Sequence, residues 1–314
     1  MTVVCIGNTK SGRGLTRRLL RRFTDRLESR GVRVLELTLN DPNFPEEARF
    51  DTQRFKGARA ILAFGGDGTV NAVTDAAIRT ETPVYHIPCG NENLIARRYG
   101  MNRDPDTFFR ALAEYRVIHS DVGLVAGRRF LIMATVGPDA RVIERLHRTR
   151  TKALGHLAYV EPVLREATAP YMPRLSITVD DEIKVADRPG WLIVANDREY
   201  AARLNFAPDA GPLNRSLAAV FLPGTNLRDC FNWTLRAWAR RHTRDPRMIT
   251  AHGTKIRIES SADSTDAALT FQLDGEHDPH IAGHLEPNGT AKPTIDISLD
   301  AARLPVLVPD LRRV

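Results

Sequence analysis

The chain has 314 residues, 42% of them hydrophobic and 26% charged, which is the composition of an ordinary soluble globular protein. This length exceeds the usual size of a single hydrophobic core and predicts two domains. The net charge of +7, supplied mostly by scattered arginines, fits a protein that handles phosphates or docks on anionic lipid. No helix-turn-helix, zinc-finger or RNA-binding signature is present, which argues against a nucleic-acid partner.

The apolar runs of the sequence are too short to span a bilayer, and the first residues lack the basic start and cleavage site of a signal peptide. The three cysteines are odd in number and have no metal-ligand spacing. We therefore expect a cytoplasmic protein with reduced thiols and no metal held by cysteine.

The first third of the chain alternates predicted strands and helices. The predicted strands cover residues 3–6, 32–37, 58–64 and 83–87, and apolar residues recur at helical spacing over residues 15–27 and 69–78. This alternation is typical of a parallel α/β sheet, whose ligands bind at the carboxyl ends of the strands.

The segment Gly65-Gly66-Asp67-Gly68-Thr69 stands between the third strand and the following helix. Glycines let backbone N–H groups approach phosphates, and a helix N-terminus adds positive potential. A carboxylate beside the same anion makes sense chiefly if a metal ion or a transferred proton is also there. The alternative is a strand-to-helix turn in which Asp67 caps the helix. In this context the motif favours binding of nucleotide phosphates.

Two further polar loops that contain glycine follow predicted strands, at residues 8–14 and 88–93. The carboxyl ends of parallel strands meet at one edge of a sheet, so these loops and the GGDGT segment are expected to line one cleft. Lys10-Ser11 lacks the preceding glycine of a Walker sequence, and the glycine loops would have to hold the phosphates instead.

From about residue 117 the pattern changes to short strand-like segments with few helices. The predicted strands cover residues 130–134, 175–179, 191–195, 217–221, 255–258 and 269–273, and the predicted helices cover residues 153–167 and 228–241. We expect a parallel α/β domain over residues 1–120 and a mostly antiparallel β domain over residues 121–299. The C-terminal tail, from about residue 300 to 314, is expected to pack back on the first domain.

These motifs resemble the diacylglycerol kinase catalytic-domain superfamily, bacterial lipid kinases whose relatives include sphingosine and ceramide kinases. Residues 8–14 are similar to the family's NPxSGxG loop, residues 65–71 match its GGDGTxN motif, and Asp274-Gly275-Glu276 matches its DGE motif. Segments 120–123, 129–131 and 137–140 follow its mid-chain strands in order. The resemblance implies an α/β ATP-binding domain of the NAD kinase and diacylglycerol kinase type, followed by a β-sandwich.

The resemblance also implies transfer of a phosphoryl group from ATP, with Mg²⁺, to a hydroxyl of diacylglycerol or a related lipid at a membrane surface. Asp67 would orient Mg–ATP or assist proton removal, and Glu276 would be the general base on the acceptor hydroxyl. Asp274-Gly275 is also a strong turn signal, and a tight turn can itself present a glutamate. The implied nucleotide contacts are Asn8, Lys10, Ser11, Gly12, Thr38, Gly65, Gly66, Asp67, Gly68, Thr69, Asn71, Gly90, Asn91 and Asn93.

Three segments depart from the family pattern. Asn91 stands in place of a threonine, and Leu94 in place of a carboxylate or amide. Only Asn196 remains of a glycine-rich segment that here ends in Ala201-Ala202-Arg203. Asn214-Arg215 replaces an Asp-Gly that helps many members hold a structural Mg²⁺. Because hard cations favour carboxylates, we predict that this metal site is lost.

These departures leave two other functions open: a non-catalytic lipid- or nucleotide-binding relative, and a soluble-substrate kinase of the NAD kinase type. The acceptor lipid and the oligomeric state, including a homodimer, are not specified by the sequence. Membrane contact is expected to be peripheral, on the inner face, and electrostatic. Trp233, Leu235 and Trp238, with nearby arginines, could form a lipid-facing stripe, although a helix packed on the β domain is the favoured interpretation.

Overall fold

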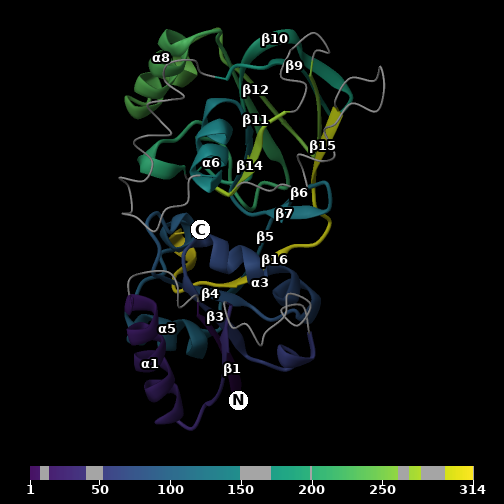
Figure 1. Cartoon of the computed structure of the whole chain (residues 1–314). Coiled ribbons are helices and arrows are strands. Elements are labelled where there is room, and N and C mark those ends of the chain that lie inside the picture. The colour runs from purple at the N-terminus through teal and green to yellow at the C-terminus, as the bar shows by residue number, and fades with distance from the viewer. Residues whose placement is uncertain are drawn as a thin grey trace. The chain divides into compact units, whose positions relative to one another are not determined.

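The chain folds as two compact units, Met1–Ser120 with Ala302–Val314 and Asp121–Ala301 (Figure 1). The computed structural model describes residues 1–7, 14–39, 52–148, 171–198, 200–260, 269–276 and 294–313.

The first unit is built on a six-stranded sheet with the strand order β2-β1-β3-β4-β16-β5. The strands are β1 (Thr2–Gly7), β2 (Arg33–Thr38), β3 (Ala60–Gly65), β4 (Val84–Pro88), β5 (Val117–Ser120) and β16 (Leu304–Leu307). All adjacent pairs are parallel except β16 and β5. The central strand β3 is buried along its whole length, as expected of a parallel strand covered on both faces. The predicted parallel α/β class is confirmed.

The helices of the first unit are α1 (Leu15–Glu28), α3 (Asp67–Thr80), α4 (Leu94–Tyr99) and α5 (Pro105–Glu114), with a short 3₁₀ turn at η2 (Thr52–Arg54) and another at η6 (Leu311–Arg313). Aromatic side chains join α1 and α5 to one face of the sheet. The Phe23 ring lies 5.4 Å from Phe64 and 6.0 Å from Phe108. Helix α5 begins where the Asp104 carboxylate accepts the N–H groups of Asp106 and Thr107, an ordinary N-cap.

All described strand pairs of the second unit are antiparallel. Its strands are β6 (Gly123–Val125), β7 (Arg128–Phe130), β8 (Met133–Val136), β9 (Arg174–Val179), β10 (Glu182–Ala195), β11 (Leu217–Pro223), β12 (Ile249–Gly253), β13 (Lys255–Ser260), β14 (Phe271–Leu273) and β15 (Thr294–Leu299). Its helices are α6 (Pro138–Arg148) and α8 (Leu227–Trp238), with 3₁₀ turns at η4 (Ala201–Arg203) and η5 (His242–Arg244).

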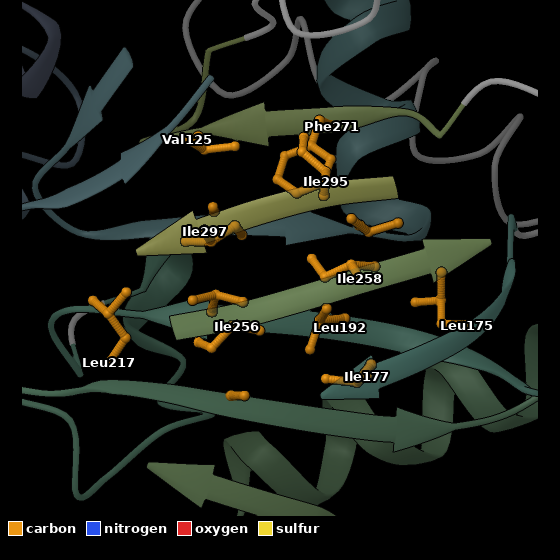
Figure 2. Packing of buried hydrophobic residues seen from close by; sticks show 14 of the residues in the cluster. Val125, Leu175, Ile177, Leu192, Leu217, Ile256, Ile258, Phe271, Ile295 and Ile297 are labelled. Atoms are coloured by element: carbon orange, nitrogen blue, oxygen red, sulfur yellow. The ribbon is translucent and has the colours of Figure 1, made fainter. Parts of the chain in front are cut away.

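The long strand β10 joins the two layers of this second unit. Its first part pairs with β9, and its later part pairs with β11 and β8. Branched aliphatic side chains fill the space between the layers, as Figure 2 shows for Ile256 and Ile258 of β13 and Ile295 and Ile297 of β15. This antiparallel, sandwich-like arrangement confirms the predicted class of the second part of the chain.

The structure corrects several predicted elements. The predicted strand over residues 130–134 is divided, because Leu131 and Ile132 form a bend between β7 and β8. The predicted helix over residues 228–241 ends at Trp238, and Arg240 has a left-handed φ of 53° that no helix continues through. Helices α4, α5 and α6 were not predicted, and the predicted helix over residues 153–167 lies outside the described residues.

Across the described residues, none of the helices combines the length and the apolar character that crossing a membrane requires.

Candidate functional site

The predicted binding loops leave the sheet of the first unit at one edge. In the strand register Gly7 lies beside both Thr38 and Phe64, and Gly65 lies beside Pro88. Because β1 to β4 are parallel, the segments that follow Gly7, Thr38, Gly65 and Pro88 all begin at the carboxyl edge. Asn8, Lys10, Ser11 and Gly12 lie outside the described residues.

Two of these loops are packed glycine against glycine. A Cβ atom added to Gly90 would lie 2.7 Å from the Gly66 Cα atom and 3.3 Å from the Gly66 nitrogen. The N–H groups of Cys89 and Gly90 both donate to the Gly65 carbonyl, at 2.7 and 3.3 Å. The side-chain amide of Asn93 exchanges hydrogen bonds with the Gly90 backbone at 2.8 and 2.7 Å. The GGDGT loop and the residue 88–93 loop therefore form one bonded pair.

Asp67 holds the start of the next helix along the chain. Its Oδ2 atom accepts the N–H of Leu94 at 2.9 Å, and its Oδ1 atom accepts the N–H of Ile95 at 3.0 Å. The N-cap residue of α4, Asn93, is in the left-handed region and supplies no side-chain cap of its own. Asp67 thus caps a helix, as the alternative interpretation of its motif proposed, but it caps α4 rather than its own helix α3.

The buried His86 of β4 contacts both the backbone and the carboxylate of the GGDGT loop. The Nε2 atom of His86 lies 2.9 Å from the Gly65 carbonyl oxygen, and its Nδ1 atom lies 4.0 Å from Asp67 Oδ1. Burial lowers the pKa of His86, so the ring is neutral, and Nε2 must carry its hydrogen because a carbonyl only accepts. Sequence reasoning missed His86; its signal is a polar residue in the otherwise apolar strand β4.

The N-terminus of α3 is arranged to meet an anion. Its N-cap is Gly66, which has no side chain to cap the helix and an extended backbone conformation. The Thr69 N–H donates to the Gly66 carbonyl at 3.0 Å, so the N–H groups that precede it and the positive end of a 14-residue helix remain available to an external acceptor. Thr69 is buried and packs against Gly65, whereas Gly68 and Asn71 are partly exposed in the first two turns. Asn91 is exposed at the tip of the neighbouring loop.

The predicted turn at Asp274-Gly275 is present in the second unit. Both residues have a left-handed φ, 50° and 81°, the combination that a two-residue hairpin turn requires. Leu273 and Glu276 flank the turn and exchange backbone hydrogen bonds at 2.9 and 2.8 Å. The Glu276 side chain is exposed. The turn therefore presents Glu276 to its surroundings from a fixed backbone.

Asp274 fixes this turn to the preceding part of the unit. Its carboxylate accepts three successive backbone N–H groups, from Leu131 at 2.7 Å, Ile132 at 2.8 Å and Met133 at 3.0 Å. These bonds take the N–H groups that a continuous strand would give to a neighbouring strand. They are the physical reason why the predicted strand over residues 130–134 is divided.

A network of side-chain hydrogen bonds also holds the turn in place. Gln272 accepts the Gly275 N–H at 2.6 Å and donates to Asp139 at 3.4 Å. Asp139 also accepts the hydroxyls of Thr135 and Tyr200, each at 2.7 Å. Burial raises the pKa of Asp139, although all of these donors favour its charged form. Sequence reasoning missed Gln272, whose signal is a polar residue in the buried strand β14.

The segment Asn214-Arg215, where we predicted loss of a structural metal, meets a buried carboxylate. Asp121 is fully buried, and its Oδ1 atom lies 2.8 Å from Arg215 Nη1. The Arg215 backbone N–H donates to the other carboxylate oxygen at 2.7 Å. Among the described ranges, no three or more His, Cys, Asp and Glu side chains gather closely enough to hold a metal ion. A guanidinium thus supplies the positive charge beside Asp121.

We expect Arg215→Ala to lower the free energy of unfolding by about 3 kcal/mol, because the mutation removes the guanidinium that pairs with the buried Asp121 carboxylate. Arg174→Ala is the matched control, since Arg174 pairs with Asp187 at 2.7 Å but both side chains are half exposed. The control is expected to change stability by less than about 1 kcal/mol. Urea unfolding of both variants measures the difference. Equal losses would show that burial of Asp121 has no special effect.

Comparison with known proteins places both units in described families. The model for the diacylglycerol kinase catalytic domain matches residues 2–125. The model for the YegS C-terminal NAD kinase beta sandwich-like domain matches residues 133–293. Together the two matches cover most of the chain, and they confirm the resemblance inferred from its motifs.

Two individual relatives share less than a third of their residues with this chain over the aligned segments. A diacylglycerol kinase of Mycobacterium tuberculosis is 28% identical over 221 residues, which are 66% of this chain and 69% of that protein. An uncharacterised protein of Synechocystis is 26% identical over 186 residues, 56% of this chain, and the match spans only 43% of the relative's length.

The fold has a counterpart among solved structures. A crystal structure of a diacylglycerol kinase from Bacillus anthracis aligns over 100% of this chain and 98% of its own, with a TM-score of 0.70 and 19% identity. Such low identity supports the fold alone. The two family models, joined in one chain in the order that the motifs predicted, carry the assignment: this chain belongs to the diacylglycerol kinase catalytic-domain superfamily.

Proposed function

We propose that this chain is an ATP-dependent lipid kinase, which transfers the γ-phosphoryl group of ATP to a hydroxyl of diacylglycerol or a related lipid. The observation that supports this most is the bonded pair of glycine loops at the carboxyl edge of the first sheet. Gly90 approaches Gly66 so closely that a side chain on Gly90 does not fit, and the contact lies beside the start of α3, whose N-cap Gly66 has no side chain. Backbone N–H groups at a helix N-terminus suit phosphate oxygens.

The residues of this edge fit a nucleotide. The N–H groups that precede Thr69 at the start of α3, including that of Gly68, would hold phosphate oxygens together with the side chains of Thr69 and Asn71. Thr38 lies at the end of β2, on the same edge of the sheet. Bound Mg–ATP supplies the phosphoryl group and a cation that neutralises phosphate charge. Asp67 keeps unshared lone pairs on both oxygens while it caps α4, so it can orient such a cation as well as the loop pair.

Glu276 is the proposed general base. A carboxylate can take the acceptor's proton late in a loose transition state, when the bond between the transferred phosphoryl group and the leaving ADP is largely broken. Its exposed position on the Asp274-Gly275 turn leaves the side chain accessible to a lipid hydroxyl. The bonds of Asp274 and Gln272 to the surrounding backbone hold that turn still, which limits the conformational entropy lost on reaction.

The direct test is transfer of label from γ-labelled radioactive ATP, with Mg²⁺, into the organic phase of a total lipid extract. We expect one or a few labelled lipids whose labels are removed by a phosphomonoesterase. Label recovered in NADP⁺ when NAD⁺ is supplied, with none in lipid, would assign a soluble-substrate kinase of the NAD kinase type. Measurable ATP binding without transfer to either acceptor would assign a non-catalytic binding protein.

A further inference from the structure

Helix α8 of the second unit carries a stripe of large apolar side chains on its outer surface. Leu227, Phe231, Leu235 and Trp238 are 44%, 62%, 48% and 73% exposed. Their spacing of four, four and three residues places them on one face of the helix. Isolated exposed apolar residues are common, but four in a row along one helix make a continuous surface.

The opposite face of α8 already anchors the helix to the unit (Figure 1). Trp233 and Ala237 are buried in a cluster with side chains of β10 and β11. The Trp233 Nε1–H donates to the Pro223 carbonyl at 2.8 Å. The favoured interpretation of the sequence, a helix packed on the β domain, therefore holds for Trp233, whereas Trp238 belongs to the exposed stripe. The stripe is not needed to seat the helix.

Positive charge surrounds the stripe. Residues 225–248 contain six arginines and two aspartates. Arg228, Arg240, Arg241 and Arg244 are exposed, and no carboxylate within the described parts of the chain pairs with them.

Both nearby aspartates are already engaged. Asp245 pairs with Arg236 at 3.0 Å and Arg247 at 2.8 Å, and the hydrogen bond from Arg247 lowers the pKa of Asp245 to about 2. Asp229 accepts the Thr225 N–H at the start of the helix. The surface that borders the stripe thus carries a net positive charge near neutral pH.

We propose that α8 is a docking helix for an anionic lipid bilayer, lying in the plane of the interface with its stripe among the acyl chains. Apolar side chains with a terminal tryptophan, bordered by arginines, match the layered chemistry of such an interface. A second copy of this chain is a poorer occupant, because pairing two α8 helices face to face would bring their arginines together. The proposal concerns how the protein reaches a lipid surface and requires no phosphoryl transfer.

The test is sedimentation with vesicles of phosphatidylcholine, with and without phosphatidylglycerol, in the absence of ATP. The test variant replaces Phe231, Leu235 and Trp238 by serine in the full chain, and the control is Ile183→Ser, at a 69% exposed isoleucine of β10 in the same unit. We expect wild type and control to bind phosphatidylglycerol vesicles, and the triple variant to bind at least about tenfold more weakly. Thermal unfolding should be the same for all three, because the replaced side chains are exposed.

A second variant, with Arg228, Arg240 and Arg241 changed to glutamate, separates charge from apolar contact. This variant should bind vesicles with and without phosphatidylglycerol equally well. Added salt should weaken binding of the wild-type protein to phosphatidylglycerol vesicles until it equals that of the variant. A blue shift of tryptophan emission on vesicle binding, absent from Trp238→Phe, would place α8 itself in the lipid. Vesicle binding that is unchanged in the triple variant would overturn the proposal. So would self-association that the triple variant abolishes while vesicle binding persists. A failed kinase assay alters neither outcome, because no nucleotide is present.

Discussion

Glu276→Gln is expected to reduce lipid phosphorylation by about a thousandfold, because an amide cannot take the proton of the acceptor hydroxyl. Glutamine keeps the size of the side chain, and the Glu276 side chain is exposed, so the flanking turn should be unaffected. ATP binding and thermal stability are expected to stay at wild-type values. The measurements are initial rates of label transfer into lipid, nucleotide binding by calorimetry and a thermal unfolding curve.

The control for this experiment is Glu182→Gln, which changes another exposed glutamate of the same unit. It should leave the rate unchanged. A Glu276→Gln variant that retained most of the activity would remove Glu276 from the chemistry, and the turn would then be no more than a connection. A variant that lost ATP binding as well would point to a structural role for the side chain instead of proton transfer.

The sequence predicts the four parallel strands β1 to β4 of the first sheet because each of them carries a local apolar signal, whereas β5 and β16 are not among the predicted strands. Buried parallel strands are continuous apolar runs, and the run over residues 60–65 is buried at every position. Each of the four predicted strands is followed by a loop or a helix, which is the pattern of a parallel sheet and needs no long-range information. The motif at residues 65–69 was located for the same reason, since both the strand and the helix that border it are local features.

What the sequence could not predict depends on contacts between distant residues. Helix α4 has only six residues, and the carboxylate that caps it belongs to Asp67, 27 residues before Leu94. The bend at Leu131 and Ile132 is set by Asp274, more than 140 residues later. Periodicity within a window of ten or twenty residues contains neither contact. The local sign of such contacts in the sequence is a polar residue within an apolar strand, such as His86 or Gln272.

Gly90→Ala is expected to lower the free energy of unfolding by about 2 kcal/mol, because its methyl group would overlap backbone atoms that cannot rotate away. The new Cβ atom would lie 2.7 Å from the Gly66 Cα atom and 3.2 Å from Asn93 Oδ1. The GGDGT loop would have to move by a substantial part of an ångström. Displacement of that size in a phosphate site is expected to reduce the rate of phosphoryl transfer by about a hundredfold.

Gly66→Ala tests the same contact from the other side. Its Cβ atom would lie 3.5 Å from the Gly90 Cα atom, an ordinary van der Waals distance, and the backbone at Gly66 is extended, with φ of −91°. We therefore expect Gly66→Ala to change stability by less than about 0.5 kcal/mol. Urea unfolding of the two alanine variants, with ATP binding measured beside it, gives the comparison. If both alanines destabilise the chain equally, the loops are not held at the separation described, and the phosphate site would be formed by some other contact. If only Gly90→Ala destabilises the chain, the contact between the two loops requires a residue without a side chain at position 90. Loss of ATP binding in the same variant would show that nucleotide binding depends on this contact.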